Sequence, residues 1–271
     1  MDGGEDGGEG SGLRQRHIMG VGGPVVQNWH RTCVTLLAAV SAGTLVAACS
    51  PPSRLDLMCM AGDVERCHQL ADMYATGNGV PRDVARAASL YERVCEAGDA
   101  DVCNTLGEIY EQGAVVGVAA RHIEDLFARA CDGGSLFGCV NLGLVAAATG
   151  NAERAAGLFE RACAGGAAAG CHHLAATLEK GEGIPRNLPR AVVLYEQACE
   201  ADFVESCFAL ETLFTSGGAV ERNVALALRA LARAVQIHSA SCEAGVARDC
   251  EARDRARARM TVLQQQAAGR P

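Results

Sequence analysis

Twelve of the fourteen cysteines form six pairs whose members lie eight residues apart, and this pattern constrains the fold more than any other feature. The pairs are Cys59 with Cys67, Cys95 with Cys103, Cys131 with Cys139, Cys163 with Cys171, Cys199 with Cys207, and Cys242 with Cys250. The first cysteines of successive pairs are 36, 36, 32, 36 and 43 residues apart. A period in this range is typical of a solenoid, in which each unit buries its apolar face against the next unit.

Apolar positions recur in step with the cysteines. A leucine stands eleven residues after the first cysteine of each unit, and a large apolar residue recurs near the end of the unit. These residues are Leu70, Leu106, Leu142, Leu174 and Leu210, then Tyr91, Phe127, Phe159, Tyr195 and Leu231. Spacings of three and four around them indicate helices, and breakers such as 77–81 separate two helical halves. We therefore expect an all-α protein in which each unit is helix A, a loop and helix B.

Two units depart from the regular period. The third unit lacks four residues, which predicts a shorter loop between its helices at Thr149–Asn151. The fifth unit carries seven extra residues around Val235–Ser241. Seven residues are nearly two helical turns, so helix B can lengthen there without rotating its buried face.

The spacing of eight within each cysteine pair predicts a break between two helices. Two cysteines eight apart on one helix would lie about 12 Å apart along its axis, whereas a disulfide needs Cα atoms within about 7 Å. A glycine stands between the two cysteines in five pairs, and Asp202 takes that place in the other pair. We expect the first cysteine to end helix B and the second to start the next helix A, so that a disulfide staples adjacent units. The alternatives are free cysteines in the core and zinc ligands, which are normally spaced two to four apart.

The N-terminal segment predicts export. Residues 1–18 are rich in glycine and acid and are expected to be disordered or an over-long gene start, because Met19 is a second possible initiator. Residues 19–48 have the basic start, the short apolar run and the small residues of a signal peptide. Their end, Val-Ala-Ala before Cys49, resembles the lipobox of bacterial lipoproteins, which implies lipid on Cys49 and a tether over 49–58. Ser50 fits outer-membrane sorting, facing the periplasm, by the same resemblance; secretion, or an uncleaved anchor, is the alternative.

The units resemble Sel-1-like repeats, which are relatives of the tetratricopeptide repeat. The resemblance is carried most specifically by Leu70–Asp83 and by Leu174–Asn187, and it covers about 59–250 as five repeats. The cysteine pairs narrow it to the secreted cysteine-rich branch of that family. The resemblance implies a right-handed αα-hairpin solenoid, a superhelix that acts as an interaction scaffold. Residues 251–271 are expected to form a capping helix and a disordered, glutamine-rich tail.

A second reading follows from the same family, because some cysteine-rich members are described as β-lactam-binding or β-lactamase-like. A serine β-lactamase needs Ser-x-x-Lys, but Thr177 stands three residues before Lys180, the chain's one lysine. The sequence also lacks the His-Glu-x-x-His pattern of a zinc protease. We therefore expect a non-catalytic protein with no cofactor and no metal, and an envelope hydrolase remains the alternative.

The resemblance places a binding groove on the exposed positions of helix A, which line the concave face. The predicted groove residues are Glu65, His68, Asp72, Asp101, Asn104, Glu108, Glu111, Phe137, Val140, Leu144, His172 and Lys180. Acidic residues in the first two units give way to apolar residues in the third, so we expect a protein or peptide partner with basic residues beside an apolar anchor. A net charge of −8 disfavours nucleic acid. Membrane contact is expected through the lipid anchor only, and the oligomeric state stays open.

Overall fold

The computed structural model describes residues 51–217 and 220–268. The predicted signal peptide, the possible initiator Met19 and the predicted lipidation site Cys49 lie outside these ranges. All contacts reported below fall within one compact unit, which spans Leu55–Pro271. None of the helices in the described ranges combines the length and the apolar character that crossing a membrane requires.

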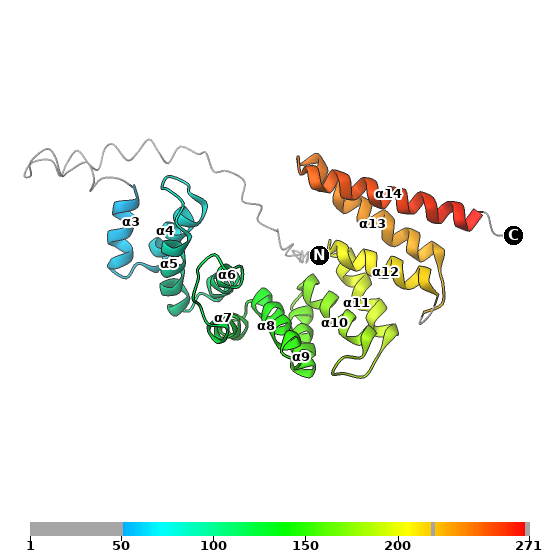
Figure 1. The fold of residues 1–271 in the computed structure, drawn as a ribbon, viewed down its shortest axis with the longest axis horizontal. Coiled ribbons are helices and arrows are strands. Elements are labelled where there is room, and N and C mark those ends of the chain that lie inside the picture. Colours follow the sequence, from blue (N-terminus) through cyan, green and yellow to red (C-terminus); the bar gives the residue numbers. More distant parts are fainter. Residues whose placement is uncertain (1–50, 218–219, 269–271) are drawn as a thin grey trace, which may run out of the picture. The chain divides into compact units, whose positions relative to one another are not determined.

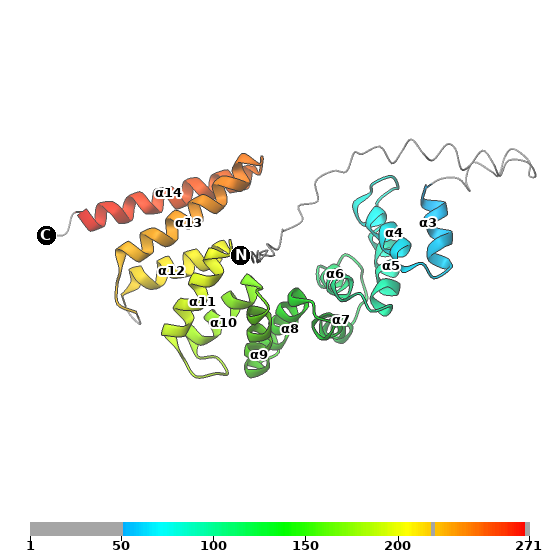
Figure 2. The ribbon, with the colours of Figure 1, turned by 180° about the vertical axis from the view of Figure 1, so that it is seen from behind.

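Twelve helices and no strand occur in the described residues (Figure 1). Their bounds are α3 (Pro51–Met60), α4 (Val64–Thr76), α5 (Val84–Glu96), α6 (Ala100–Glu111), α7 (Ala120–Asp132), α8 (Leu136–Ala148), α9 (Ala152–Ala164), α10 (Ala168–Lys180), α11 (Leu188–Glu200), α12 (Val204–Ser216), α13 (Val224–Glu243) and α14 (Ala247–Ala268). From α4 to α14, each helix packs against the next helix along the chain. Figure 2 shows this succession of pairs from behind. The predicted all-α solenoid of αα-hairpins is confirmed.

We call α4, α6, α8, α10 and α12 the A helices and α5, α7, α9, α11 and α13 the B helices. Most of these helices start at an Asp, Asn or Ser whose side chain accepts a hydrogen bond from the backbone N–H three residues later, as Asp63 does from Arg66. Such caps satisfy one of the donors that a helix start leaves unpaired. The repeat in sequence thus includes the signal that starts each helix.

Glycine in the A helices lets the two helices of a hairpin approach closely. A Cβ added at Gly107 would lie 2.5 Å from a ring carbon of Phe127, and a Cβ at Gly143 would lie 2.5 Å from the ring of Phe159. The large ring of helix B therefore sits where helix A has no side chain. This complementarity helps to fill a core in which most of the other buried side chains are alanine, leucine and cysteine.

All six predicted disulfides are formed, with Cα–Cα distances of 4.4 to 4.9 Å. Cys59 is bonded to Cys67, Cys95 to Cys103, Cys131 to Cys139, Cys163 to Cys171, Cys199 to Cys207, and Cys242 to Cys250. The first cysteine of each pair lies in the last turn of one helix and the second in the first turns of the next helix, as expected. The alternatives of free core cysteines and zinc ligands are therefore set aside for these twelve residues. On the chain-entropy account each staple stabilises the fold by about 2.5 kcal/mol.

The turn inside each staple requires an unusual backbone conformation. In five pairs one glycine between the cysteines has positive φ, for example 95° at Gly62, a conformation that glycine adopts without a steric penalty. Asp202 replaces glycine in the fifth pair and has φ 67°, and no other non-glycine residue in the described ranges has positive φ. The turn geometry is thus kept in the one unit that lacks the glycine.

The two irregular units behave as the sequence predicts. Only residues 149–151 separate α8 from α9, so the deletion shortens the loop of the third hairpin. Helix α13 has 20 residues where α11 has 13, so the insertion lengthens helix B of the fifth hairpin. The deletion falls between α8 and α9 and the insertion lies within α13, so the cysteines stay at the junctions between hairpins.

The ends of the repeat region differ from the sequence expectation. Residues 49–58 were expected to form a tether, but α3 begins at Pro51, Leu55 packs against the core of the first hairpin and Asp56 forms an ion pair with Arg86. Helix α3 thus takes the place of a B helix before the first hairpin. At the other end, α14 continues to Ala268 through the glutamine-rich stretch that was expected to be disordered.

Arginines on the B helices join successive hairpins. Arg93, Arg129 and Arg161 donate to the backbone oxygens of Cys59, Cys95 and Cys131, at 2.7, 2.9 and 2.7 Å. Cys59 lies in the last turn of α3, and Cys95 and Cys131 lie in the last turns of the B helices α5 and α7. Carbonyl groups in the last turn lack partners within the helix and attract positive charge. We name these contacts the arginine clamps. Gln197 takes the corresponding position in the fourth hairpin.

Exchanging the clamp residue should change stability in opposite directions at two sites. We expect Arg129→Gln to lower the free energy of unfolding by about 1 kcal/mol, because a charge-assisted hydrogen bond to a helix end is lost. The reverse change, Gln197→Arg, should raise it by up to about 1 kcal/mol, because it adds a clamp to the hairpin that has glutamine there. Chemical denaturation of the oxidised protein measures both, and equal effects of the two variants would contradict the clamp.

Candidate binding surface on the A helices

Most of the predicted groove residues reach solvent. Those that are exposed are Glu65, Asp72, Asp101, Glu111, Phe137, Leu144 and Lys180, and those that are half-buried are His68, Glu108 and His172. They lie on four successive A helices, α4 to α10. Helix α8 packs against both α6 and α10, so the residues of the middle repeats form a continuous surface.

Two of the predicted residues do not reach solvent. Asn104 and Val140 are both buried, and the expectation that they are exposed is wrong. They occupy equivalent positions in α6 and α8, and Asn141 of α8 contacts the Asn104 side chain. Val140 belongs to the same core cluster as Phe127 and Leu142, so it stabilises the fold and is not available to a partner.

Phe137 and Leu144 form an exposed apolar pair on α8. Phe137 is 64% exposed and Leu144 is 40% exposed. Seven residues are nearly two helical turns, so both side chains lie on one face of the helix. Large apolar side chains exposed as a group are typical of interaction sites. We call this pair the apolar anchor site.

Asn141 lies between these two residues and connects α8 to α6. Its side-chain nitrogen donates to Asn104 Oδ1 at 2.9 Å and to Glu108 Oε1 at 3.1 Å, and Asn104 itself donates to Glu108 at 2.9 Å. This amide–carboxylate network fixes the apolar anchor site relative to the acidic helix before it. Sequence reasoning missed Asn141, although an amide one turn before Leu144 is a signal that could have singled it out.

The acidic residues of the first repeat are held in place by neighbouring side chains. Asp72 accepts a hydrogen bond of 2.6 Å from the Tyr91 hydroxyl, and His68 Nε2 lies 3.7 Å from the same carboxylate. Burial and the bond to Asp72 raise the pKa of Tyr91 far above its usual range, so the phenol remains a donor at any physiological pH. The negative charge of this carboxylate is therefore positioned beside the A-helix surface and is not free to move.

His172 belongs to a group of rings between α10 and α12. Its Nδ1 lies 2.9 Å from Ser206 Oγ, and its ring centroid lies 4.9 Å from that of Phe203 and 5.4 Å from that of Tyr195. Burial, and to a smaller extent the charge of His173, lowers the pKa of His172 to about 4. At neutral pH the ring is uncharged, so His172 contributes apolar surface instead of positive charge.

The contact between His172 and Ser206 does not make a nucleophile. Ser206 is 0% exposed, so a substrate cannot reach its hydroxyl. The contact instead joins two A helices of adjacent hairpins, as the Asn141 network does between α6 and α8. Residues 51–217 and 220–268 contain no group of three side chains placed to hold a metal ion.

Comparison with known proteins agrees with the repeat architecture. Residues 67–99, 139–166 and 168–203 match the Sel1 repeat family. The solved Sel1 repeat protein from Oxalobacter formigenes is 20% identical, with a TM-score of 0.58 over 65% of this chain and 74% of that chain. At this identity the likeness concerns the fold alone. No curated protein matches the sequence significantly.

Two further solved structures resemble the chain more weakly. A protective antigen of uropathogenic Escherichia coli with an SLR fold is 19% identical, with a TM-score of 0.45 over 79% of this chain and 55% of that chain. An immunity protein from Pseudomonas aeruginosa is 20% identical, with a TM-score of 0.46 over 79% of this chain and 83% of that chain. We draw no functional conclusion from either of them.

The lowered pKa of His172 predicts that stability decreases in mild acid. The folded state keeps this ring neutral down to about pH 4, whereas the unfolded chain takes up a proton near pH 6.5. The unfolded state therefore binds more protons between these values, and stability present above pH 6.5 is lost as the pH falls towards 4. Because solvent partly screens this half-buried ring, we expect the free energy of unfolding to fall by only about 1 kcal/mol between pH 7 and pH 5.

Thermal unfolding followed by circular dichroism at pH 7, 6 and 5 measures this loss. The variant His172→Gln should show a smaller decrease over the same range, because glutamine does not titrate. The explanation is wrong if wild type and variant lose stability in parallel.

Proposed function

We propose that the chain is a non-catalytic interaction scaffold that binds an extended protein segment along the A helices. Sel1 repeat proteins generally bind protein partners, and the Sel1 fold is generally non-enzymatic. The single observation that carries the proposal is the apolar anchor site, where Phe137 and Leu144 are exposed together in the middle of the A-helix surface. Burying both side chains against a partner would contribute several kcal/mol to binding.

Charge defines the partner further. Glu65, Asp72, Asp101 and Glu111 are exposed on the two helices before the apolar anchor site, and Glu108 is half-buried there. We infer a segment with basic residues that precede or follow one bulky apolar residue. Complementary charges of this kind favour rapid association and the correct register more than they increase affinity.

Mutation of the apolar anchor site tests the surface. A library of displayed random peptides, selected on the oxidised protein, should be enriched in lysine or arginine beside a bulky apolar residue. The double variant Phe137→Glu, Leu144→Glu should bind the enriched peptides at least tenfold more weakly, because it places charge where the apolar side chain docks. Isothermal titration calorimetry measures the affinity.

Val116→Glu is the matched control, because Val116 is an exposed apolar residue in the loop between α6 and α7. It should bind as wild type does. Unchanged binding by the double variant would move the site away from α8. Turnover of nitrocefin by the folded protein would instead favour the rival reading, a β-lactam hydrolase.

Six disulfides indicate that the protein is exported or periplasmic, because the cytosol keeps thiols reduced. We infer further that lipid on Cys49 anchors it to the bacterial envelope, at the periplasmic face of the outer membrane. The support is the lipobox-like Val-Ala-Ala-Cys sequence. Acyl chains hold a protein to a membrane surface without a spanning helix.

Replacement of Cys49 tests the anchor. The wild-type protein, expressed in a Gram-negative host, should incorporate radiolabelled palmitate and sediment with outer membranes. Cys49→Ala should lose the label and appear in the soluble periplasmic fraction. Equal labelling of the two proteins would refute lipidation at this residue and would leave the A-helix proposal untouched.

A further inference from the structure

The last of the six disulfides differs from the others in its exposure to solvent. The cysteines of the first five bridges are all buried, with exposed fractions of 7% or less. Cys242 and Cys250, which form the last bridge, are both only half-buried. A disulfide reacts with a thiol only where the thiol can reach one of its sulfurs. Access therefore separates the last bridge from the other five.

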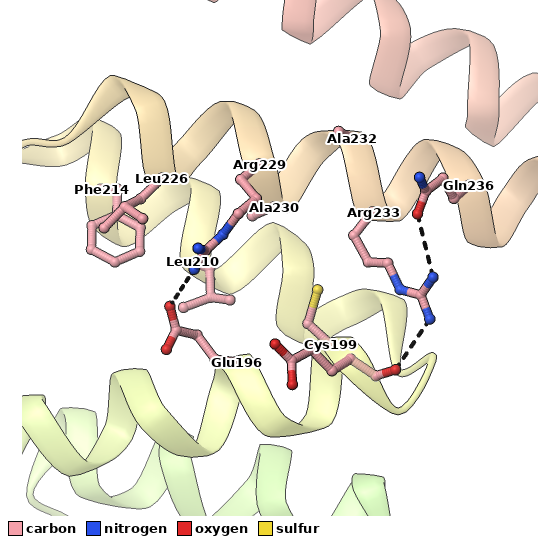
Figure 3. A pocket seen from close by; sticks show the side chains of 11 residues that line it. Glu196, Cys199, Leu210, Phe214, Leu226, Arg229, Ala230, Ala232, Arg233 and Gln236 are labelled. Carbon is pink, nitrogen blue, oxygen red and sulfur yellow. Dashed lines mark hydrogen bonds and ion pairs between the residues drawn. The ribbon is translucent and has the colours of Figure 1, made fainter.

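The helix that follows a junction accounts for this difference. At the junction before the last, Arg233 of α13 donates to the backbone oxygen of Glu200 at 3.1 Å, beside Cys199 (Figure 3). Arg233 also donates to Asp202, within the same turn, at 2.7 Å. Helix α14 is the last helix of the described residues, and among them no later B helix packs over the junction between α13 and α14.

Arg253 of α14 places a positive charge beside one sulfur of the last bridge. Its Nη1 donates to Cys242 Sγ at 3.4 Å. A neighbouring cation stabilises a thiolate, and a stabilised thiolate leaves faster in thiol–disulfide exchange. Cys242 is therefore the better leaving group, and Cys250 carries the sulfur that an incoming thiolate attacks.

The first bridge shows that such a contact is not sufficient by itself. Arg93 Nη1 donates to Cys59 Sγ at 3.2 Å, a contact of the same kind. Cys59 is nevertheless 0% exposed, so a thiol cannot reach it while the protein is folded. Among the six bridges, only Cys242–Cys250 combines partial exposure with an arginine on a sulfur.

We propose that the Cys242–Cys250 bridge is a site of exchange with low-molecular-weight thiols, while the other five bridges persist in the folded protein. The thiolate of the small molecule bonds to Cys250 Sγ, and the bond between Cys250 and Cys242 breaks. The electron pair leaves with Cys242 as a thiolate beside Arg253. A second thiolate then attacks the small molecule's sulfur in this mixed disulfide and frees Cys250. Two thiols are thereby oxidised to one disulfide, and the bridge is reduced to two thiolates.

Non-covalent contacts hold α14 in place when the bridge opens. Leu263 belongs to the core cluster of the last hairpins, Arg259 forms an ion pair with Glu211 of α12, and Asp249 lies 3.2 Å from His238 of α13. The exchange therefore frees the turn at 243–249 and leaves the repeats folded. It is a covalent modification away from the surface on α4 to α10, so it goes beyond the proposed function and is tested independently of it.

Mapping the sites of reaction with glutathione tests the proposal. The oxidised protein is incubated with reduced glutathione at pH 7.5, its free thiols are trapped with N-ethylmaleimide, and its peptides are identified by mass spectrometry. At early times we expect glutathione on Cys250 and maleimide on Cys242. This reaction should be at least about tenfold faster than reaction at any other bridge, because access limits exchange. Circular dichroism of the same sample should show unchanged helix content.

Exchange of Arg253 tests the leaving group. Arg253→Gln should slow the reaction about threefold, because the departing thiolate loses its cation. Arg255→Gln is the matched control, since Arg255 lies on the same helix and pairs with Glu251; it should react as wild type does. In Cys250→Ser, iodoacetamide should alkylate the free Cys242 faster at pH 6.5 than in Cys250→Ser, Arg253→Gln, which a purely structural role of Arg253 would not produce.

Equal reaction of all six bridges, first reaction at another bridge, or no reaction in the folded protein would overturn the exchange site. Glutathione on Cys242 in place of Cys250, or equal slowing by Arg253→Gln and Arg255→Gln, would overturn the role of Arg253. The map of the wild-type protein decides the site even if a variant does not fold.

Discussion

A covalent bond across each turn between hairpins is the constraint on which the rest of the structure depends. The disulfide joins the last turn of one helix to the first turns of the next. Its Cα–Cα distance of 4.4 to 4.9 Å fixes how close the end of the first helix lies to the start of the second. Once that distance is set, glycine at the turn and a ring opposite Gly107 or Gly143 determine the packing inside the hairpin. A core poor in aromatic side chains can then remain thin.

Polar contacts between hairpins add to the staples on both sides of the solenoid. On the B helices, arginine clamps bind the helix ends, and ion pairs such as Arg190–Glu160 connect neighbouring B helices. On the A helices, Asn141 joins α8 to α6 and His172 joins α10 to α12.

The chain has one lysine among its 24 lysine and arginine residues, and the arginine clamps give a physical reason for the preference for arginine. A planar guanidinium can donate to a carbonyl and a carboxylate at once, whereas an ammonium group is a compact point charge.

The sequence predicted the features that depend on the spacing of residues within one repeat unit. The positions of the turns, the short loop at 149–151 and the long helix α13 follow from the cysteine period and from where residues are lost or gained. The burial of Asn104 and Val140 could not be predicted in this way, because it depends on packing between helices that are far apart in sequence. The Asn141 network and the arginine clamps depend on the same relation between hairpins.

The short loop that each staple closes also determines how the protein would respond to pulling at its ends. Each disulfide spans a separation of only eight residues, so it protects the turn and leaves the hairpin between two staples free to yield. Under tension the hairpins would open one at a time, and the stretch from Cys67 to Cys95, a separation of 28 residues, would extend to about 90 Å of chain. The locked turns would remain as preformed nuclei on which each hairpin could close again when the load is removed. Oxidation would thus favour recovery of the fold after extension, in addition to its effect on stability.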